Sequence, residues 1–328
     1  MTNNFLDSSD KNKSQEMEWV NILKGLGIIL VVVGHVFSGI AINYIYIFHM
    51  PLFFFLAGFL MKIKPRKKYF REKFLYLIIP YISFSLLFMA LTIFLLAYNS
   101  QLTVKSFEVL LVKNFLGGDY LIGWQDVFWF VTVFFIAQQL LNFLLNLYSM
   151  KTIFYICCFS LLLAYLNDFF LSFYFPWAIN VVLYALPIMF VGYAYKQKVV
   201  TLNFGVSVSV AVLMFILVYF FPKVFFLDLK YSHYGLVIIN FLAAFSIINV
   251  LIYLSKLISF YSFSRIFSKI GKASMTIMFT HQFFAFNLKN HFENVFFIFI
   301  VVLLLSYIIH VILTYYATLS TPFLGVHK

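Results

Sequence analysis

Residues 21–35 read NILKGLGIILVVVGH, and this almost uninterrupted apolar run decides the fold class. It lies inside a stretch of about 20 apolar residues, the length that an α-helix needs to cross the roughly 30 Å hydrocarbon layer of a membrane. Similar stretches recur along the chain, so we expect an all-α integral membrane protein, a polytopic bundle of about ten transmembrane helices. The expected spans cover residues 20–40, 45–61, 74–98, 126–147, 152–168, 177–195, 201–221, 235–255, 274–289 and 295–318.

The composition excludes a soluble enzyme. Of the 328 residues, 64% are hydrophobic and 10% are charged, and the mean hydropathy is +0.98, whereas soluble domains carry roughly 25% charged residues. No hydrophilic stretch is long enough for a second domain. We therefore expect a polar cytoplasmic tail over residues 1–18, one transmembrane domain over residues 19–320 and a short cytoplasmic tail over residues 321–328. The adjacent Cys157 and Cys158 would point in different directions on a helix, so we expect neither a disulfide framework nor a metal site.

The positive charges are distributed unevenly among the predicted loops. With the N-terminus inside, 18 of the 23 Lys and Arg residues fall on the cytoplasmic side. Because cytoplasmic loops of membrane proteins are enriched in Lys and Arg, this distribution favours a topology with both termini in the cytoplasm. The net charge of +12 then reflects membrane orientation, and we expect the lipid bilayer, and no nucleic acid, as the partner of the basic surface.

Two ionisable residues lie within the first predicted span, where their burial in lipid would be costly and a function is the usual reason for it. Lys24 and His35 are eleven residues apart, which is within about 20° of three full helical turns. Both therefore lie on one face, about 16 Å apart along the axis, and Asn21 continues that face. The structural alternative is that Lys24 snorkels to the interface and His35 makes a packing hydrogen bond.

Two more histidines belong to predicted spans. His49 precedes Pro51 at the start of the second span, where proline fits the first turn of a helix, and the short connection puts His49 within reach of His35. His281 lies in the ninth span. Each of these residues is equally compatible with an interfacial or packing position.

A dense basic segment, residues 62–73, follows the second span and contains Lys68, Arg71 and Lys73. One interpretation is an anchor for anionic lipids. The other is an anion site beside Lys24, which would attract a phosphate-bearing donor such as a coenzyme A ester.

Aromatic and acidic residues gather before the fourth span, on the predicted outer side. Trp124, Asp126 and Trp129 fit the aromatic belt of a membrane protein. They would also suit a sugar, which binds through stacking on apolar faces together with hydrogen bonds. No Asp or Glu lies well inside a predicted span, which disfavours an ion-coupled transporter.

Residues 21–59 resemble the opening of a known family. Lys24-Gly25 and His35 have the spacing, and the segment from His49 to Phe59, HMPLFFFLAGF, has the pattern of the acyltransferase-3 family of bacterial membrane acyltransferases. The likeness is strongest to its branch of sugar O-acetyltransferases similar to fucose 4-O-acetylase. Two positions depart from the family pattern. Asn21 stands where Asp is usual, and Lys24 replaces the commoner Arg, which loses a bidentate contact to phosphate.

The resemblance implies that residues 19–320 form an acyltransferase domain in the bacterial plasma membrane. It implies transfer of an acetyl, succinyl or other short acyl group from acyl-CoA, used as a donor substrate without any permanently bound cofactor, to a hydroxyl of a cell-surface polysaccharide or lipid-linked sugar. His35 would be the general base, with His49 or His281 as donor to the oxyanion, or a histidine would carry the acyl group. The donor-binding residues would be Lys24, Asn21, Lys68, Arg71 and Lys73, and the acceptor-binding residues Trp124, Asp126 and Trp129.

Two other functions also fit the sequence. One is an exporter or carrier for polysaccharide or lipid-linked sugar, in which the histidines serve packing or gating. The other is a structural subunit that works with further polysaccharide-biosynthesis proteins. The missing intramembrane carboxylates and the lack of an internal repeat favour the enzyme over the carrier.

Overall fold

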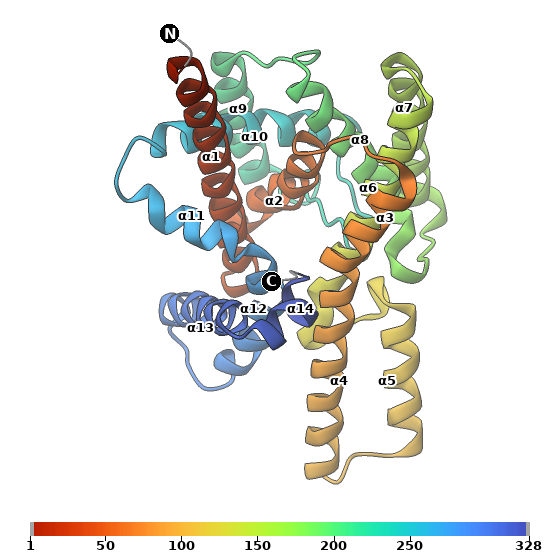
Figure 1. The fold of residues 1–328 in the computed structure, drawn as a ribbon. Coiled ribbons are helices and arrows are strands. Elements are labelled where there is room, and N and C mark those ends of the chain that lie inside the picture. Colours follow the sequence, from red (N-terminus) through yellow and green to blue (C-terminus); the bar gives the residue numbers. More distant parts are fainter. Residues whose placement is uncertain (1–2, 326–328) are drawn as a thin grey trace.

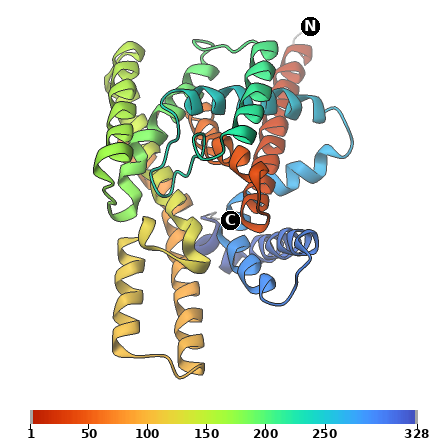
Figure 2. The same cartoon turned by 180° about the vertical axis from the view of Figure 1, so that it is seen from behind.

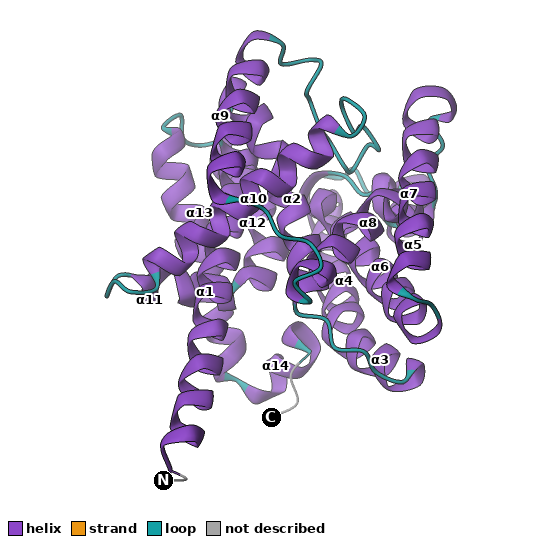
Figure 3. Ribbon diagram, turned by 90° about the horizontal axis from the view of Figure 1, so that it is seen from above, coloured by secondary structure: helices purple, strands orange, loops and turns teal. Residues whose placement is uncertain are grey.

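The computed structural model describes residues 3–325, with side chains from residue 18 onward, and most of this part is helical (Figures 1 and 3). The predicted all-α polytopic fold is confirmed. Along the chain, the elements are α1 (Asn3–Val36), α2 (Ile40–Phe59), α3 (Arg66–Lys73), η1 (Phe74–Ile78), α4 (Ile79–Tyr98), α5 (Val104–Leu116), η2 (Gly118–Tyr120), η3 (Gly123–Phe128), α6 (Trp129–Leu147), α7 (Met150–Leu166), η4 (Asn167–Leu171), η5 (Pro176–Ala178), α8 (Ile179–Lys196), α9 (Phe204–Phe220), α10 (Ile239–Ile258), α11 (Ser264–Lys272), α12 (Ser274–Lys289), α13 (Val295–Tyr315) and α14 (Ala317–Leu324).

Each predicted span falls on one helix or on one run of joined helices, but fewer than ten reach full spanning length. Among the described residues, eight segments are long and apolar enough to cross a membrane. The predicted spans 201–221 and 274–289 became α9, with 17 residues, and α12, with 16 residues. At a rise of 1.5 Å per residue such helices reach about 25 Å, slightly less than the hydrocarbon layer. The cytoplasmic placement of both termini stays a prediction.

The second helix begins earlier than expected, and the expectation that Pro51 sits in its first turn is wrong. α2 starts at Ile40, so Pro51 lies in the middle of the helix and His49 two residues before it. The chain reverses at Gly39, whose φ of 112° is a conformation that side chains rarely adopt. Because this glycine makes the turn so short, the apolar run after it continues directly as helix.

The predicted tails are only partly separate from the bundle. Residues 3–17 of the predicted N-terminal tail continue α1 as one helix. At the other end, α14 packs its buried Ser320 and Leu324 against the bundle, so the predicted tail over residues 321–328 is helical up to Leu324. Residues 326–328 of that tail lie outside the described residues.

Glycines allow α2 and α8 to cross at close range. A Cβ added at Gly58 in α2 would overlap the carbonyl group of Met189 in α8, and one added at Gly192 in α8 would overlap the carbonyl group of Phe55 in α2. At each glycine, the backbone of the other helix therefore packs directly against the Cα, in the space that a side chain would fill. Small residues at such crossings are the usual means of packing helices in a membrane, where no hydrophobic effect drives them together.

The segment between α9 and α10 was expected to be an outer loop, and its centre is instead inserted into the bundle. A tight antiparallel turn joins Asp228 to His233 through two backbone hydrogen bonds of 2.8 and 2.9 Å. Lys230, in the tip of this turn, and Tyr234, directly after it, are 4% and 0% exposed. We call residues 226–234 the inserted turn.

Polar contacts hold the inserted turn in place. Asp168, just after α7, accepts a 2.8 Å hydrogen bond from the backbone N–H of Tyr234, and Asn180 of α8 donates to Ser232. The ring of Tyr234 also stacks on Tyr184 of α8 at 4.4 Å. In contrast, α4 and α5 project as a pair beyond the rest of the bundle, and α5 has no buried residue (Figures 1 and 2).

Candidate active site

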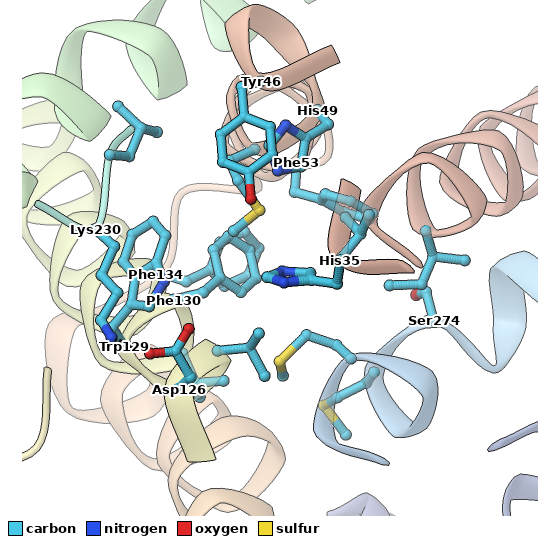
Figure 4. Close-up of a pocket in the computed structure, with 18 of the residues that line it drawn as sticks. His35, Tyr46, His49, Phe53, Asp126, Trp129, Phe130, Phe134, Lys230 and Ser274 are labelled. Carbon is cyan, nitrogen blue, oxygen red and sulfur yellow. Dashed lines mark hydrogen bonds and ion pairs between the residues drawn. The ribbon is translucent and has the colours of Figure 1, made fainter. Parts of the chain in front are cut away.

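A cavity of about 190 Å³ lies where α1, α2, η1, α6, α12 and the inserted turn meet (Figure 4). Its walls are mostly aromatic and aliphatic, with a few polar groups, which is the usual make-up of a ligand site. The π-helical turn η1 contributes Tyr76 and Leu77. The polar and titratable residues that line the cavity are Lys24, His35, Tyr46, His49, Tyr76, Asp126, Trp129, Asp228, Lys230, Tyr231 and Ser274.

One face of α1 forms a wall of this cavity. Lys24, Ile28, Val31 and His35 all line it, as their helical spacing predicts. The 34 residues of α1 make a continuous helix, so this wall holds a fixed geometry over the 16 Å or so between Lys24 and His35. The cavity therefore follows α1 for about 16 Å, which is roughly half the thickness of a 30 Å hydrocarbon layer.

A second cavity adjoins the first at its cationic end. It has a volume of about 240 Å³ and shares Lys24, Phe53, Tyr76 and Phe134 with the first cavity. Three further lysines line it, and one of them, Lys64, pairs with Glu72. We call this region, with Lys24, Lys62, Lys64 and Lys73, the lysine end.

His35 is in contact with His281 of α12. Their ring centroids are 5.1 Å apart with an interplanar angle of 52°, and His281 is fully buried. Nδ1 of His281 lies 2.8 Å from the carbonyl oxygen of Ile277. A carbonyl oxygen only accepts, so Nδ1 carries the proton and Nε2 carries a lone pair. Within the described residues that buried Nε2 has no hydrogen-bond partner, which leaves it available to a neighbouring N–H.

His49 has the same tautomer as His281 but faces the cavity. Its Nδ1 lies 3.0 Å from the carbonyl oxygen of Ile45, one turn earlier in α2, so Nδ1 carries the proton. Its Nε2 is thus a hydrogen-bond acceptor. In this neutral form neither His49 nor His281 has a free N–H for an oxyanion, and both act as acceptors.

The end of α1 is tied to the end of α12. The ammonium group of Lys289 donates a 2.8 Å hydrogen bond to the backbone carbonyl of His35, in the last turn of α1. A cation at this position also interacts favourably with the helix dipole. This contact fixes the backbone of His35 relative to the helix that carries His281.

The opposite end of the cavity contains two carboxylates and one ammonium group. Lys230 of the inserted turn forms an ion pair with Asp126 and donates a 3.0 Å hydrogen bond to the carbonyl of Leu121. Asp228 accepts a 3.0 Å hydrogen bond from the backbone N–H of Lys230, and burial raises the pKa of the Asp228 carboxyl. We call Asp126, Asp228 and Lys230 together the carboxylate end; Trp129 lines the wall beside it (Figure 4).

Several residues predicted for the site lie elsewhere. Lys73 lines the lysine end, but Lys68 and Arg71 are exposed on α3 and line neither cavity. Asn21 lies at the crossing of α1 and α11, where its carbonyl contacts Gly271, and it lines neither cavity. Trp124 packs edge-on against Phe283 at 4.9 Å, also away from both cavities.

Other site residues could not be found from the pattern of spans. Lys230 and Asp228 belong to a connection between two helices, and the insertion of this connection into the bundle is a tertiary feature. The unusual density of polar residues between Asp228 and His233, next to long apolar helices, was a usable signal. Tyr46 lies one helical turn before His49 and shares its face, so helical spacing could have identified it.

Comparison with known families identifies the chain. The model of the Acyl_transf_3 family, described as an acyltransferase domain, matches residues 17–318. The chain belongs to the acyltransferase-3 family. It is a multi-pass membrane protein of acyltransferase type, and the family predicted from residues 21–59 is confirmed. Searches of curated proteins and of solved structures found no match.

Proposed function

We propose that this acyltransferase transfers an acetyl, succinyl or other short acyl group from acyl-CoA to a hydroxyl of a cell-surface polysaccharide or lipid-linked sugar, in the bacterial plasma membrane. The observation that supports this most is the arrangement of one continuous wall, in which Lys24 at the cationic end and His35 about 16 Å further along face the same cavity. Such a wall suits a donor with an anionic head and a long, thin reactive arm.

The lysine end would hold the phosphates of the donor. Lys24, Lys62 and Lys73 bring positive charge to a concave surface, where it is focused by the low-dielectric walls. The pantetheine arm would then follow the apolar face formed by Ile28 and Val31 toward His35. This placement leaves Lys68 and Arg71 of α3 to the lipid surface or the solvent.

His35 would act as general base in the transfer. The acceptor oxygen attacks the thioester carbonyl carbon, and its proton moves to a ring nitrogen of His35. As the tetrahedral intermediate collapses, the new C–O bond is retained and the C–S bond breaks. The imidazolium then returns the proton to the departing thiolate, so that the products are an ester and a free thiol. No other reactant is needed.

His281 would orient and stabilise the base. If the N–H of His35 donates to the unpartnered Nε2 of His281, the lone pair of the other His35 nitrogen turns toward the cavity. Nδ1–H of His281 in turn donates to the carbonyl of Ile277. This chain of hydrogen bonds has the same logic as a catalytic triad, in which the third member fixes the tautomer of the base.

The proposal is tested by substituting His35 in cells that produce the surface glycan. We expect His35→Ala to lose the base-labile acyl groups of the glycan while glycan export stays normal. His291→Ala, at an exposed histidine after α12, is the matched control and should keep them. If the His35 variant is present in the membrane, keeps its ester content and lowers glycan export instead, the acyltransferase assignment fails and a carrier is favoured.

A further inference from the structure

The two ends of the active-site cavity carry opposite charge. Among the described residues that line the lysine end, four are lysines and one, Glu72, is acidic. The described residues at the carboxylate end include two carboxylates, Asp126 and Asp228, and one cation, Lys230. His35 lines the same cavity as the carboxylates, about 16 Å along α1 from Lys24. The donor and the acceptor that meet at His35 would therefore enter surroundings of opposite electrostatic character.

The cation of the carboxylate end is already engaged by the protein. The Lys230 side chain is 5% exposed, and its ammonium group is held by Asp126 and by the carbonyl of Leu121. Two of its three N–H groups are used by these partners and its charge is already balanced by Asp126, so an anionic ligand would gain less from it than from an unpaired cation. Lys230 thus neutralises Asp126 and offers little to an anionic ligand.

The charge that remains at this end is negative, and the neutral groups beside it include donors as well as acceptors: the indole N–H of Trp129 and the hydroxyls of Tyr46 and Tyr231 line the same cavity. Asp228 receives backbone N–H bonds and has no cationic partner among the described side chains other than Lys230 beside it. His49 is 4% exposed, lines the cavity and presents the lone pair of Nε2, because its Nδ1–H is bonded to Ile45. Sugar hydroxyls both donate and accept and therefore suit such a lining, and ammonium groups complement its negative charge, whereas carboxylates, phosphates and sulfates only accept and carry the same charge as Asp228.

We propose that the inserted turn makes the carboxylate end an acceptor site for a carbohydrate whose bound segment is rich in hydroxyl or ammonium groups and carries no carboxylate, phosphate or sulfate. This inference rests on the proposed function, because that function makes the bound carbohydrate the acyl acceptor. It adds the chemical class of that acceptor. It also has a consequence for a lipid-linked acceptor. The diphosphate of such a molecule must lie outside the cavity, so that the acylated hydroxyl belongs to a sugar farther along the chain.

Binding of two matched oligosaccharides to the purified protein in lipid nanodiscs tests the proposal. One is a glucose oligomer, and the other is its counterpart oxidised at C6 to glucuronic acid, so the two differ only by a CH₂OH or a carboxylate in each unit. We expect the acidic oligomer to bind at least about tenfold more weakly than the glucose oligomer, because its carboxylates and the carboxylates of the site carry like charges. A glucosamine oligomer should bind at least as well as the glucose oligomer.

Asp228→Asn is the informative variant, because it removes one charge, leaves the Asp126–Lys230 pair intact and keeps an acceptor oxygen for the N–H of Lys230. It should reduce the discrimination between the two oligomers severalfold. Glu293→Gln, an exposed acidic residue between α12 and α13, should leave the discrimination unchanged.

Equal binding of the two oligomers, preference for the acidic one, or binding of none of them would overturn the proposal. Since binding is measured without any acyl donor, it is separate from the test of the proposed function. Selective binding without acyl transfer would refute the acyltransferase scheme and keep the carbohydrate site. Equal acyl transfer to acidic and neutral glycans would refute the proposed carbohydrate selectivity and keep the acyltransferase scheme.

Discussion

At the scale of single residues, the chemistry of this protein depends on how three histidines divide the roles of donor and acceptor. His49 and His281 each commit Nδ1–H to a backbone carbonyl of their own helix, so both present Nε2 as a lone pair. His35 is the member of the group whose ring is free of such a bond among the described residues and whose ring contacts His281. That difference favours His35 as the residue that exchanges a proton with the substrate.

If His281 orients His35, removing its acceptor nitrogen should slow the chemical step. We expect His281→Ala to lower kcat on the order of 10²-fold while KM for both substrates stays within about twofold, because the base is mispositioned but the substrates still bind. His281→Gln, which keeps an acceptor oxygen near the position of Nε2, should recover part of kcat. A merely structural role for His281 predicts no recovery by Gln and an unchanged pH profile in both variants.

Asp119 makes a specific prediction about stability and pH. Its carboxylate oxygens are buried and have no hydrogen-bond partner within the described residues, and burial raises the pKa of this carboxyl to about 7. The folded protein therefore holds a proton that the unfolded chain releases near pH 4. The stabilisation is complete below that pH and is lost as the pH rises through about 7.

We accordingly expect the Tm of the protein in detergent to fall between pH 5 and pH 8.5. In Asp119→Asn, which is neutral throughout, this component of the decline should disappear, and the Tm at pH 8.5 should rise. Asp168→Asn is not a suitable control, because Asp168 holds the inserted turn; Glu293→Gln, which is exposed, is suitable. A decline of the Tm with pH in Asp119→Asn that is as steep as in the wild type, or steeper, would contradict this prediction.

At the scale of elements, the close crossing of α2 and α8 fixes how the helix that carries His49 packs in the bundle. We expect Gly58→Ala or Gly192→Ala to destabilise the protein by about 1–3 kcal/mol, because the added methyl group overlaps a carbonyl group of the opposite helix. Gly205→Ala, in the first turn of α9, is the control and should cost less than about 0.5 kcal/mol. Thermal unfolding in detergent measures all three, and equal Tm values would show that the crossing is looser than described.

Elements that are buried because of their own local sequence could be predicted. Elements that are buried through contacts with residues far away in the sequence could not. The apolar runs identified all the major helices, because a membrane span must satisfy its own backbone hydrogen bonds. Residues 41–44 were left outside the expected spans, because no sequence pattern indicated the sharp turn at Gly39. The inserted turn also escaped prediction, because Asp168, Asn180 and Tyr184, which hold it, lie far away in the sequence.

At the scale of the whole molecule, the cavity is polarised, and this gives a prediction for the donor. Lys24→Met should raise KM for acyl-CoA about tenfold, with a smaller effect on kcat, because a charge that faces the donor phosphates is removed. Lys68→Met is a matched control on exposed α3 and should leave KM within about twofold. An equal rise in both variants would mean that the basic segment acts as a diffuse field and that the lysine end is not a specific site.

The site was predictable where it follows one helix and not where it is assembled from many. Lys24 and His35 were found from the period of α1, and both line the cavity. Lys68 and Arg71 were included because charge density in a sequence does not say which side of a helix faces inward. Trp124 was included because tryptophan often stacks on sugars, but its ring packs against Phe283. Lys230 needed the three-dimensional fold.

We propose that one cavity brings acyl-CoA and a carbohydrate hydroxyl to His35, and a transfer assay is the direct test. The purified protein in lipid vesicles is given acetyl-CoA labelled in the acetyl group together with a neutral oligosaccharide. We expect label in a base-labile ester on the oligosaccharide, formed at least about 100-fold more slowly by His35→Ala. Label transfer that is equal in the wild type and in His35→Ala, or label found only as free acetate, would contradict it.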